Sequence, residues 1–215
     1  GFEGGTIGNV LTNDTLNGAV VEAEDIVLTP GVSTQPGVVM NTDGTITVSA
    51  GTPSGTYSID YTICEKGSNP ANCDTATATV VVNAATIVAV PDPSLPYNPS
   101  TPGATPNVTI NDTLNGDPVT VGDNGNVTIK DITNPESPVT VNPDGTISVT
   151  PGTPSGTYEF EYTICEKLNP SNCSSTTGSV VVSNTIVATD DNLGSVNGFE
   201  GGTIGNVLTN DTLNG

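Results

Sequence analysis

Apolar and polar residues alternate along two similar stretches of this chain. Every second residue from 57 to 63 is apolar, namely Tyr57, Ile59, Tyr61 and Ile63. The stretch from 158 to 164 has the same parity, with Tyr158, Phe160, Tyr162 and Ile164. A period of two is typical of a β-strand that buries one face. The pattern therefore predicts a long, half-buried strand that occurs twice.

Cysteines follow both of these strands. Cys64 leads through a short polar loop to Cys73 and an alternating Thr/Ala/Val run, and Cys165 leads in the same way to Cys173. All four cysteines have the outer parity, so the two in each hairpin leave the same face. We expect the disulfides Cys64–Cys73 and Cys165–Cys173, which form in an oxidising compartment. A zinc site is the rival interpretation, and it fails because the chain has no His and two cysteines per hairpin do not complete a zinc shell.

Shorter alternating runs between turn signals predict the other strands. In the first half these are residues 6–13, 20–22, 25–29, 37–40 and 45–49. In the second half they are residues 108–111, 119–121, 126–132, 138–142, 146–150 and 175–182. No segment has a helical period. Strands at this spacing indicate an all-β chain of tandem immunoglobulin-like β-sandwich modules of about 100 residues, each with a local hairpin disulfide.

Internal repeats suggest where the modules begin and end. Residues 1–18, GFEGGTIGNVLTNDTLNG, recur without change as residues 198–215, and the shorter motifs NDTLNG, DGTI and TIVA recur at about half that distance. We predict a first module at residues 1–85 that lacks its first strand, a complete module at 86–184, and the start of a third at 185–215. A sandwich without its first strand exposes an unpaired sheet edge.

Two explanations of this missing strand remain open. The chain is either a window of a longer protein, whose preceding residues supply the strand, or the tail of one copy completes the sheet of a neighbour by strand addition. Stacked modules of either kind behave as a linear array in which each unit contacts mainly adjacent repeats.

Composition and charge exclude several functions. The 215 residues include 33% hydrophobic and 4% aromatic residues and no Trp, so the cores must be thin and aliphatic. Three basic residues stand against 23 acidic ones, with a formal net charge of −20. Such a surface repels phosphate backbones, which excludes nucleic acid as a partner. With no His and no paired carboxylates for acid–base work, the chain is not expected to be an enzyme.

Acidic and amide side chains at one module junction suggest a cation site. Asp190 and Asp191 follow a TIVA motif, and Asn210 and Asp211 lie in the nearby turn. Oxygen ligands of this kind bind Ca²⁺, and no other cofactor is expected. The complete module has only Asp92 between two prolines at the equivalent place, where proline would stiffen the junction without a metal. Both interpretations stay open.

An Asp-Thr-aliphatic motif occurs four times, at Thr15, Thr75, Thr113 and Thr212. It is similar to the O-glycosylation signal of bacteria that export proteins through the type IX secretion system. The alternative is a turn in which the Asp and Thr side chains bond to local backbone.

The motifs NVLTNDTLNG, DGTI and GTPSGTY followed by YTICEK, repeated about every 100 residues, resemble the repeats of giant bacterial cell-surface adhesins. The resemblance is to gliding-motility adhesins of the SprB type, exported by the type IX secretion system. It implies an extracellular filament attached to the outer membrane, which functions in adhesion and gliding motility. Whether the chains also associate laterally stays open.

Within such a filament this chain is expected to be a stalk segment. The alternative is an adhesion module in which each repeat binds surface glycans or the substratum, with an exposed Tyr97 in the Pro-rich 91–106 loop as the best anchor.

Overall fold

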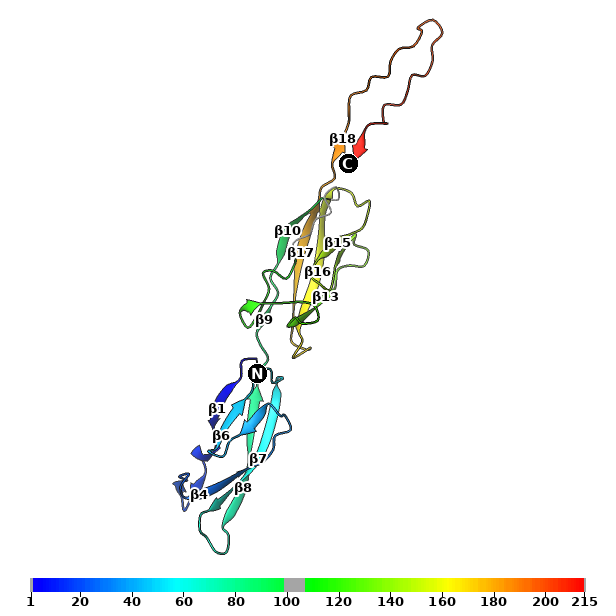
Figure 1. Ribbon diagram of the computed structural model, residues 1–215. Helices are drawn as coiled ribbons and strands as arrows, with labels where there is room; N and C mark the ends of the chain where they lie inside the picture. Colours follow the sequence, from blue (N-terminus) through cyan, green and yellow to red (C-terminus); the bar gives the residue numbers. More distant parts are fainter. Residues whose placement is uncertain (1, 99–106, 215) are drawn as a thin grey trace. The chain divides into compact units, whose positions relative to one another are not determined.

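The computed structural model describes residues 2–98 and 107–214, and strands dominate it (Figure 1). The chain divides into two compact units. Unit 1 comprises Gly1–Ile87, Thr113–Asp117 and Cys165–Cys173, and unit 2 comprises Val88–Asp112, Pro118–Ile164 and Ser174–Gly215. Within the described ranges, no helix is long and apolar enough to cross a membrane.

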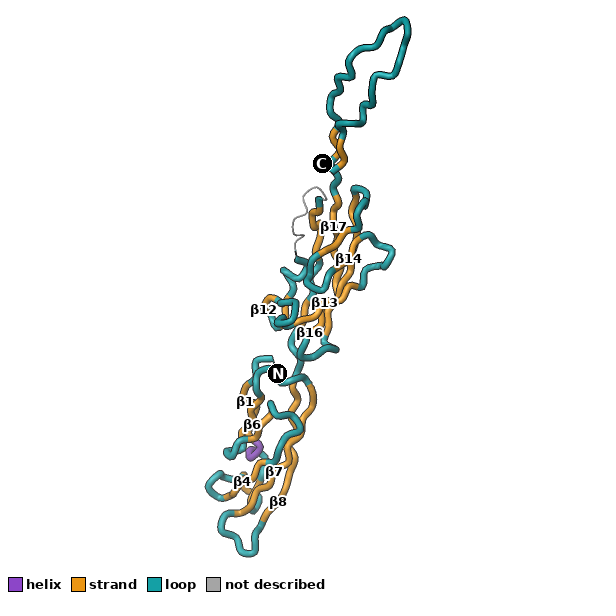
Figure 2. The backbone as a smooth tube through the Cα atoms, turned by 45° about the vertical axis from the view of Figure 1, so that its right-hand side comes forward, coloured by secondary structure: helices purple, strands orange, loops and turns teal. Residues whose placement is uncertain are grey.

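The first eight strands all precede residue 85. They are β1 (Gly5–Asn9), β2 (Thr15–Leu16), β3 (Ala19–Val20), β4 (Ile26–Pro30), β5 (Val38–Met40), β6 (Thr45–Val48), β7 (Gly55–Glu65) and β8 (Cys73–Val82). Two three-stranded sheets, β1-β6-β5 and β4-β7-β8, bury a shared core, and β2 and β3 form a small hairpin. The core consists of Val38, Met40, Ile46, Val48, Ile59, Tyr61, Val80 and Val82. A single 3-10 turn, η1 (Val10–Thr12), interrupts the strands in this region (Figure 2).

The remaining strands begin at residue 87. They are β9 (Ile87–Val88), β10 (Asp92–Tyr97), β11 (Thr113–Leu114), β12 (Asp117–Pro118), β13 (Val127–Asp131), β14 (Val139–Val141), β15 (Ile147–Val149), β16 (Gly156–Glu166), β17 (Cys173–Val182), β18 (Ile186–Val187) and β19 (Thr212–Leu213). The largest sheet has the order β10-β17-β16-β13, and β14 pairs with β15. The order β12-β11-β9 makes a further small sheet.

Two long hairpins, β7–β8 and β16–β17, confirm the predicted pattern. We call them the first and second hairpins. In the first, the antiparallel register runs from Gly55 opposite Val82 to Cys64 opposite Cys73. Disulfides join Cys64 to Cys73 and Cys165 to Cys173, with Cα atoms 4.0 and 4.1 Å apart. The inward residues are buried as expected, since Ile59 and Phe160 are each 1% exposed. The all-β, immunoglobulin-like sandwich with local disulfides is thus confirmed.

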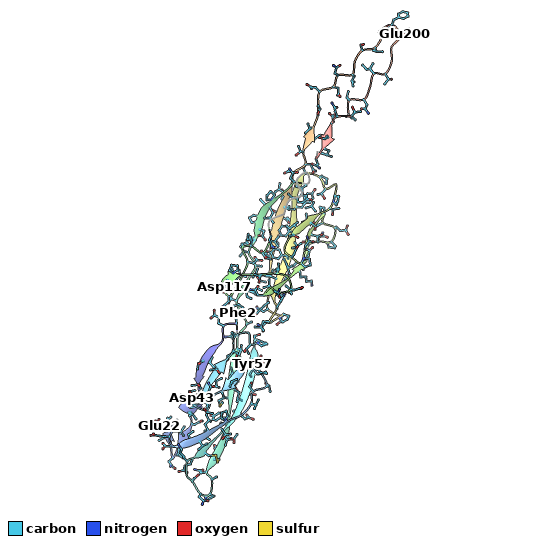
Figure 3. The ribbon with its side chains drawn as sticks, viewed as in Figure 1. Phe2, Glu22, Asp43, Tyr57, Asp117 and Glu200 are labelled. Atoms are coloured by element: carbon cyan, nitrogen blue, oxygen red, sulfur yellow. A yellow bond between two sulfur atoms is a disulfide. The ribbon has the colours of Figure 1, made fainter. Side chains whose placement is uncertain are left out.

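The short turns follow from local chemistry. Asn17 and Gly18 join β2 to β3 with φ of 54° and 82°, and Asn115 and Gly116 repeat this turn with 56° and 88°. Two-residue hairpin loops with positive φ at both positions favour Asn-Gly, because this backbone matches the twist of the strands. Asp43 closes the predicted β5–β6 turn by accepting the Thr45 N–H at 2.9 Å (Figure 3).

Several predicted strands were wrong because side chains bond to the backbone there. The run 6–13 stops at Asn9, whose Oδ1 accepts the Leu11 N–H at 2.9 Å and starts η1. The run 108–111 is a turn in which Asn107 Oδ1 accepts the Thr109 N–H at 2.9 Å. Residues 119–121 form no strand, since Asn126 Oδ1 accepts the Thr120 N–H at 2.8 Å. Asn side chains compete with ladder hydrogen bonds in this way.

The Pro-rich 91–106 segment was also expected to be a loop, and its first part is a strand. Asp92–Tyr97 forms β10, which pairs in parallel with β17, so that Leu95 lies opposite Val180 and Tyr97 opposite Val182. β10 is an edge strand, where proline is tolerated because the outer N–H groups have no ladder partner. Tyr97 is half-buried there, so the exposed anchor expected at this residue was wrong. Residues 99–106 of the expected loop lie outside the described residues.

Candidate functional site

Three polar side chains meet inside unit 2. The Tyr162 hydroxyl lies 2.9 Å from Asp92 Oδ2, 3.0 Å from Asp112 Oδ2 and 2.8 Å from the Val108 carbonyl oxygen. Tyr162 and Asp112 are 0% exposed and Asp92 is 5% exposed. We call Tyr162, Asp92 and Asp112 the tyrosine–aspartate cluster.

Neighbouring backbone holds the cluster in place. The inward parity of β16 directs Tyr162 into the core, and Asp92 is the first residue of β10. Asp112 Oδ1 accepts the Val90 N–H at 2.7 Å. Asn111 donates to the Pro91 carbonyl oxygen at 3.3 Å. Two segments twenty residues apart are therefore tied together beside the tyrosine.

The cluster has more acceptors than hydrogens. The Tyr162 hydroxyl carries one hydrogen, and three oxygens lie within hydrogen-bonding distance. If neither carboxyl carried a proton, at least one of the two would face the phenol oxygen without a hydrogen between them, and buried acceptors without a donor are costly. The arrangement therefore favours one shared proton.

Burial supports this assignment of the proton. Desolvation raises the pKa of Asp92 to about 6, against the lowering effect of the Tyr162 hydrogen bond and together with the nearby Asp112 charge. Burial also raises the pKa of Asp112, and burial with the two carboxylates raises the pKa of Tyr162. The hydroxyl stays protonated, and the cluster acts as a buried structural link between β10, β16 and the turn at Asp112.

The first hairpin has a simpler counterpart. The Tyr61 hydroxyl donates to Asp14, 3.0 Å from Oδ1 and 2.9 Å from Oδ2. Burial, followed by the Asp14 hydrogen bond, raises the pKa of Tyr61 to about 12. Tyr61 thus meets one carboxylate where Tyr162 meets two.

The predicted calcium residues lie in two places. Asp92 belongs to the cluster, whereas Asp190, Asn210 and Asp211 meet near the end of the chain. Asp211 Oδ1 accepts the Thr189 N–H at 2.9 Å, and Asn210 Nδ2 lies 3.4 Å from the Asp190 carbonyl oxygen. These contacts repeat those of Asp112 and Asn111. Asp191 is exposed.

Neither place provides a complete calcium shell. No group of three or more Asp, Glu, His or Cys side chains in residues 2–98 and 107–214 is arranged to hold a metal ion. The cluster brings together two carboxylates with a hydroxyl between them, fewer than the six to eight oxygen ligands that Ca²⁺ takes. Calcium at the junctions stays a prediction.

The candidate glycosylation threonines differ in exposure. Thr15, Thr75 and Thr212 are exposed, and Thr113 is half-buried. The Thr75 hydroxyl lies 3.1 Å from the Thr62 hydroxyl across the first hairpin. Three of the four sites therefore present their side chains to solvent.

Two structural features escaped the sequence analysis. Tyr57 and Tyr158 each donate to the carbonyl oxygen four residues upstream, at 3.0 Å, from Pro53 and Pro154. The repeated TPSGTY spacing was the available signal. Gly178 is the other feature, since a Cβ there would lie 2.8 Å from the Asp92 carbonyl oxygen and would also collide with the Phe160 ring. A glycine inside an alternating strand often marks such a close approach.

Solved structures with similar folds are extracellular domains of cadherins and protocadherins. Mouse clustered PcdhgC3 EC1–3 is 13% identical with a TM-score of 0.36, covering 74% of this chain and 55% of that chain. Mouse cadherin-23 EC22–24 is 16% identical with a TM-score of 0.34, covering 74% of this chain and 54% of that chain. This chain thus spans about half the length of both structures.

Human protocadherin-24 EC1–2 is 14% identical with a TM-score of 0.30, covering 74% of this chain and 82% of that chain. Neither the protein-family models nor the curated proteins give a match to the sequence. Because the TM-scores are low, the fold assignment rests on the sheets, hairpins and disulfides described above. The chain is an all-β protein of immunoglobulin-like sandwich architecture.

Proposed function

We propose that this chain is a structural stalk segment of a long extracellular adhesin. The observation that carries the proposal is that one disulfide-linked hairpin occurs twice with the same supporting contacts. The hairpins share a disulfide at the same end and a tyrosine bonded back to proline. The hydroxyls of Thr52 and Thr153 also donate to equivalent carbonyl oxygens three residues upstream, at 2.7 and 2.6 Å.

The physical properties of the surface suit a stalk. A net charge of −20 keeps a long array from collapsing on itself. Disulfides persist outside the cell, where small modules with thin cores need such cross-links. The buried tyrosine–aspartate cluster links β10, β16 and the turn at Asp112.

The finer parts of the proposal come from the sequence resemblance. They are attachment to the outer membrane, export by the type IX secretion system, participation in gliding motility, contacts with adjacent repeats, and lateral association of chains. Calcium at the junctions and O-glycans at Thr15, Thr75, Thr113 and Thr212 belong to the same proposal.

Antibodies raised against this chain test the location and role together. On intact cells that make the parent protein, we expect surface labelling that moves along the cell, and loss of adhesion and gliding when the gene is deleted. Labelling only after cells are permeabilised would contradict the proposal. Reproducible binding of the chain to particular sugars on a glycan array would instead support a ligand-binding repeat.

Intact-mass measurement of native protein tests the glycans. We expect masses above that of the bare polypeptide, with the added mass lost when the four threonines are replaced by alanine. A native mass equal to that of the polypeptide would remove glycosylation from the proposal.

A further inference from the structure

The loop at the end of the second hairpin is buried, although hairpin loops normally lie on the surface. Glu166–Asn172 connects β16 to β17, and we call it the second tip. It belongs to unit 1, together with the sandwich formed by β1 to β8. Glu166 is 1% exposed and Asn169 is 7% exposed. Polar side chains buried to this degree need hydrogen-bond partners, and the tip finds them inside unit 1.

Two asparagine side chains of the second tip bind main-chain atoms of that sandwich. Asn169 Oδ1 accepts the N–H of Ser54 at 2.6 Å, directly before β7 begins. Asn172 Nδ2 donates to the carbonyl oxygen of Ala85 at 2.7 Å, shortly after β8 ends. Both contacts therefore lie at the end of the first hairpin that is away from its disulfide.

The carboxyl group of Glu166 orients Asn172. Glu166 Oε2 accepts Asn172 Nδ2 at 2.7 Å, and the Glu166 N–H donates to the Asn172 carbonyl oxygen at 2.9 Å. The Asn172 N–H donates in turn to the Asn169 carbonyl oxygen at 2.8 Å. Glu166 Oε1 has no partner among the described residues, so the buried carboxyl group depends on Asn172 as its donor. The three residues thus hold one another in the geometry that contacts the sandwich.

The same pairing of glutamate and asparagine forms in the first hairpin. Its loop, Glu65–Asn72, is the first tip. Asn72 Nδ2 donates to Glu65 Oε2 at 3.0 Å, and the Glu65 N–H donates to the Asn72 carbonyl oxygen at 2.8 Å. Asn69 and Asn72 are exposed in this tip. The loop sequence therefore forms the pairing by itself, and the second tip is organised for binding before it meets a partner.

We propose that the second tip is the element by which one repeat recognises the repeat before it, with Asn169 as an acceptor and Asn172 as a donor. Both partners are main-chain groups, which do not depend on the side chains of the repeat that is recognised. The tip therefore fits repeats of different sequence, as long as the backbone before β7 and after β8 keeps its shape. The inference rests on the proposed function for its meaning in an array of repeats.

Amide hydrogen exchange of Ser54, followed by NMR in the full-length chain, tests the acceptor. Asn169→Ala removes the oxygen that holds the Ser54 N–H, and we expect this amide to exchange about tenfold faster. Asn169→Asp keeps an oxygen at the same place and should keep the exchange slow. Asn69→Ala makes the matched change in the first tip and should leave the Ser54 rate as it is.

The donor is tested by Asn172→Asp. This variant places a carboxylate against the Glu166 carboxyl group and the Ala85 carbonyl oxygen, where an N–H was needed. We expect the tip to leave its site, so that Ser54 exchanges at least as fast as in Asn169→Ala. Asn72→Asp is the matched control in the first tip and should not change the Ser54 rate. Slow exchange of the amides from 159 to 163 shows that each variant is folded.

Unchanged exchange of Ser54 in Asn169→Ala or in Asn172→Asp would overturn the proposal. Equal acceleration by the first-tip controls, or fast exchange in Asn169→Asp, would overturn it as well. These outcomes are separate from the test of the stalk function. Absence of the protein from the cell surface would remove that function and leave the Ser54 result as it is, so the two failures are distinguishable.

Discussion

The two hairpins share their supporting contacts and differ most in what lies against their outer edge. Both have an inward tyrosine that is hydrogen-bonded to an aspartate and a disulfide at the same end. At the start of each, a second tyrosine donates to the carbonyl oxygen of a proline four residues upstream. Among the described residues, only the second has a further strand along its last strand, and with it a second carboxyl group at the tyrosine. In the second hairpin, the extra strand covers the edge of β17 and brings the second carboxyl group to Tyr162.

Replacing a disulfide should have the largest effect, and it should be the same in both hairpins. The sequence separations of 9 and 8 residues are nearly equal, and closing a loop of this size stabilises by about 3 kcal/mol on a chain-entropy estimate. Hydrogen exchange of the hairpin amides in C64A/C73A and C165A/C173A measures the loss. A loss confined to one variant would show that the hairpins are not equivalent.

Tyr162→Phe should destabilise the second hairpin by about 2 kcal/mol, because one buried carboxylate loses its donor and the protonated carboxyl loses its acceptor. Tyr61→Phe should cost the first hairpin about 1 kcal/mol, since its single partner, Asp14, is half-buried and can bond to water. Amide exchange in the two variants gives both values. Equal losses would contradict the difference between the two tyrosine sites.

The pH dependence should differ between the hairpins. Folding raises the pKa of Asp92 from 3.8 to about 6, so folded protein binds this proton more tightly. The associated stability is complete below pH 3.8 and is lost as the pH rises through 6. We expect the opening free energy of the second hairpin to fall by about 2 kcal/mol between pH 4 and 7.

The first hairpin has no counterpart of Asp92 in the described residues and should not show this fall. Asp43 and Asp144, whose pKa values are lowered by their threonine partners, act in the opposite direction and in equivalent turns. Their effects therefore cancel in the comparison. Asp92→Asn should reduce the fall, leaving the part that comes from Asp112, whose pKa burial also raises. A fall of the same size in both hairpins would rule out the cluster as its source.

Gly178→Ala should have a smaller effect, about 1.5 kcal/mol, because its Cβ meets the Phe160 ring and the Asp92 backbone. The first hairpin has Ala78 at the equivalent position, beside the smaller Ile59. Ala78→Gly should cost less than about 1 kcal/mol, the usual penalty for glycine inside a strand. Thermal unfolding of the two variants ranks these effects, and a neutral Gly178→Ala would contradict the close approach of β10.

The parts of the fold that are local in sequence could be predicted. The period of two placed Ile59 and Phe160 inward and all four cysteines outward, and Asn17-Gly18 marked a two-residue turn. Local hydrogen bonds even recur without packing, since Asn206 Oδ1 accepts the Leu208 N–H at 2.9 Å as Asn9 does for Leu11. Identical sequence produced the same turn in both places.

The parts that depend on distant residues could not be predicted. Leu11 and Leu208 have the same neighbours in sequence and different exposure, because burial depends on the strands around them. Tyr162 was placed inward by parity, yet its partners are 50 and 70 residues away. The apolar pattern predicted a strand that continued past Asn9, but the strand ends there because the Asn9 side chain accepts a backbone N–H. The alternation of apolar and polar residues gives no sign of such a hydrogen bond.

Amide hydrogen exchange along β8 and β17 in dilute protein tests the central claim most directly. That claim is that β10 covers the outer edge of β17, while no described strand lies along the outer edge of β8. The account predicts slow exchange at consecutive amides from residue 180 to 182, where pairing with β16 on one side and with β10 on the other uses successive N–H groups. From residue 78 to 82 it predicts alternation, with every second amide exchanging fast. The same pattern in both strands would contradict it.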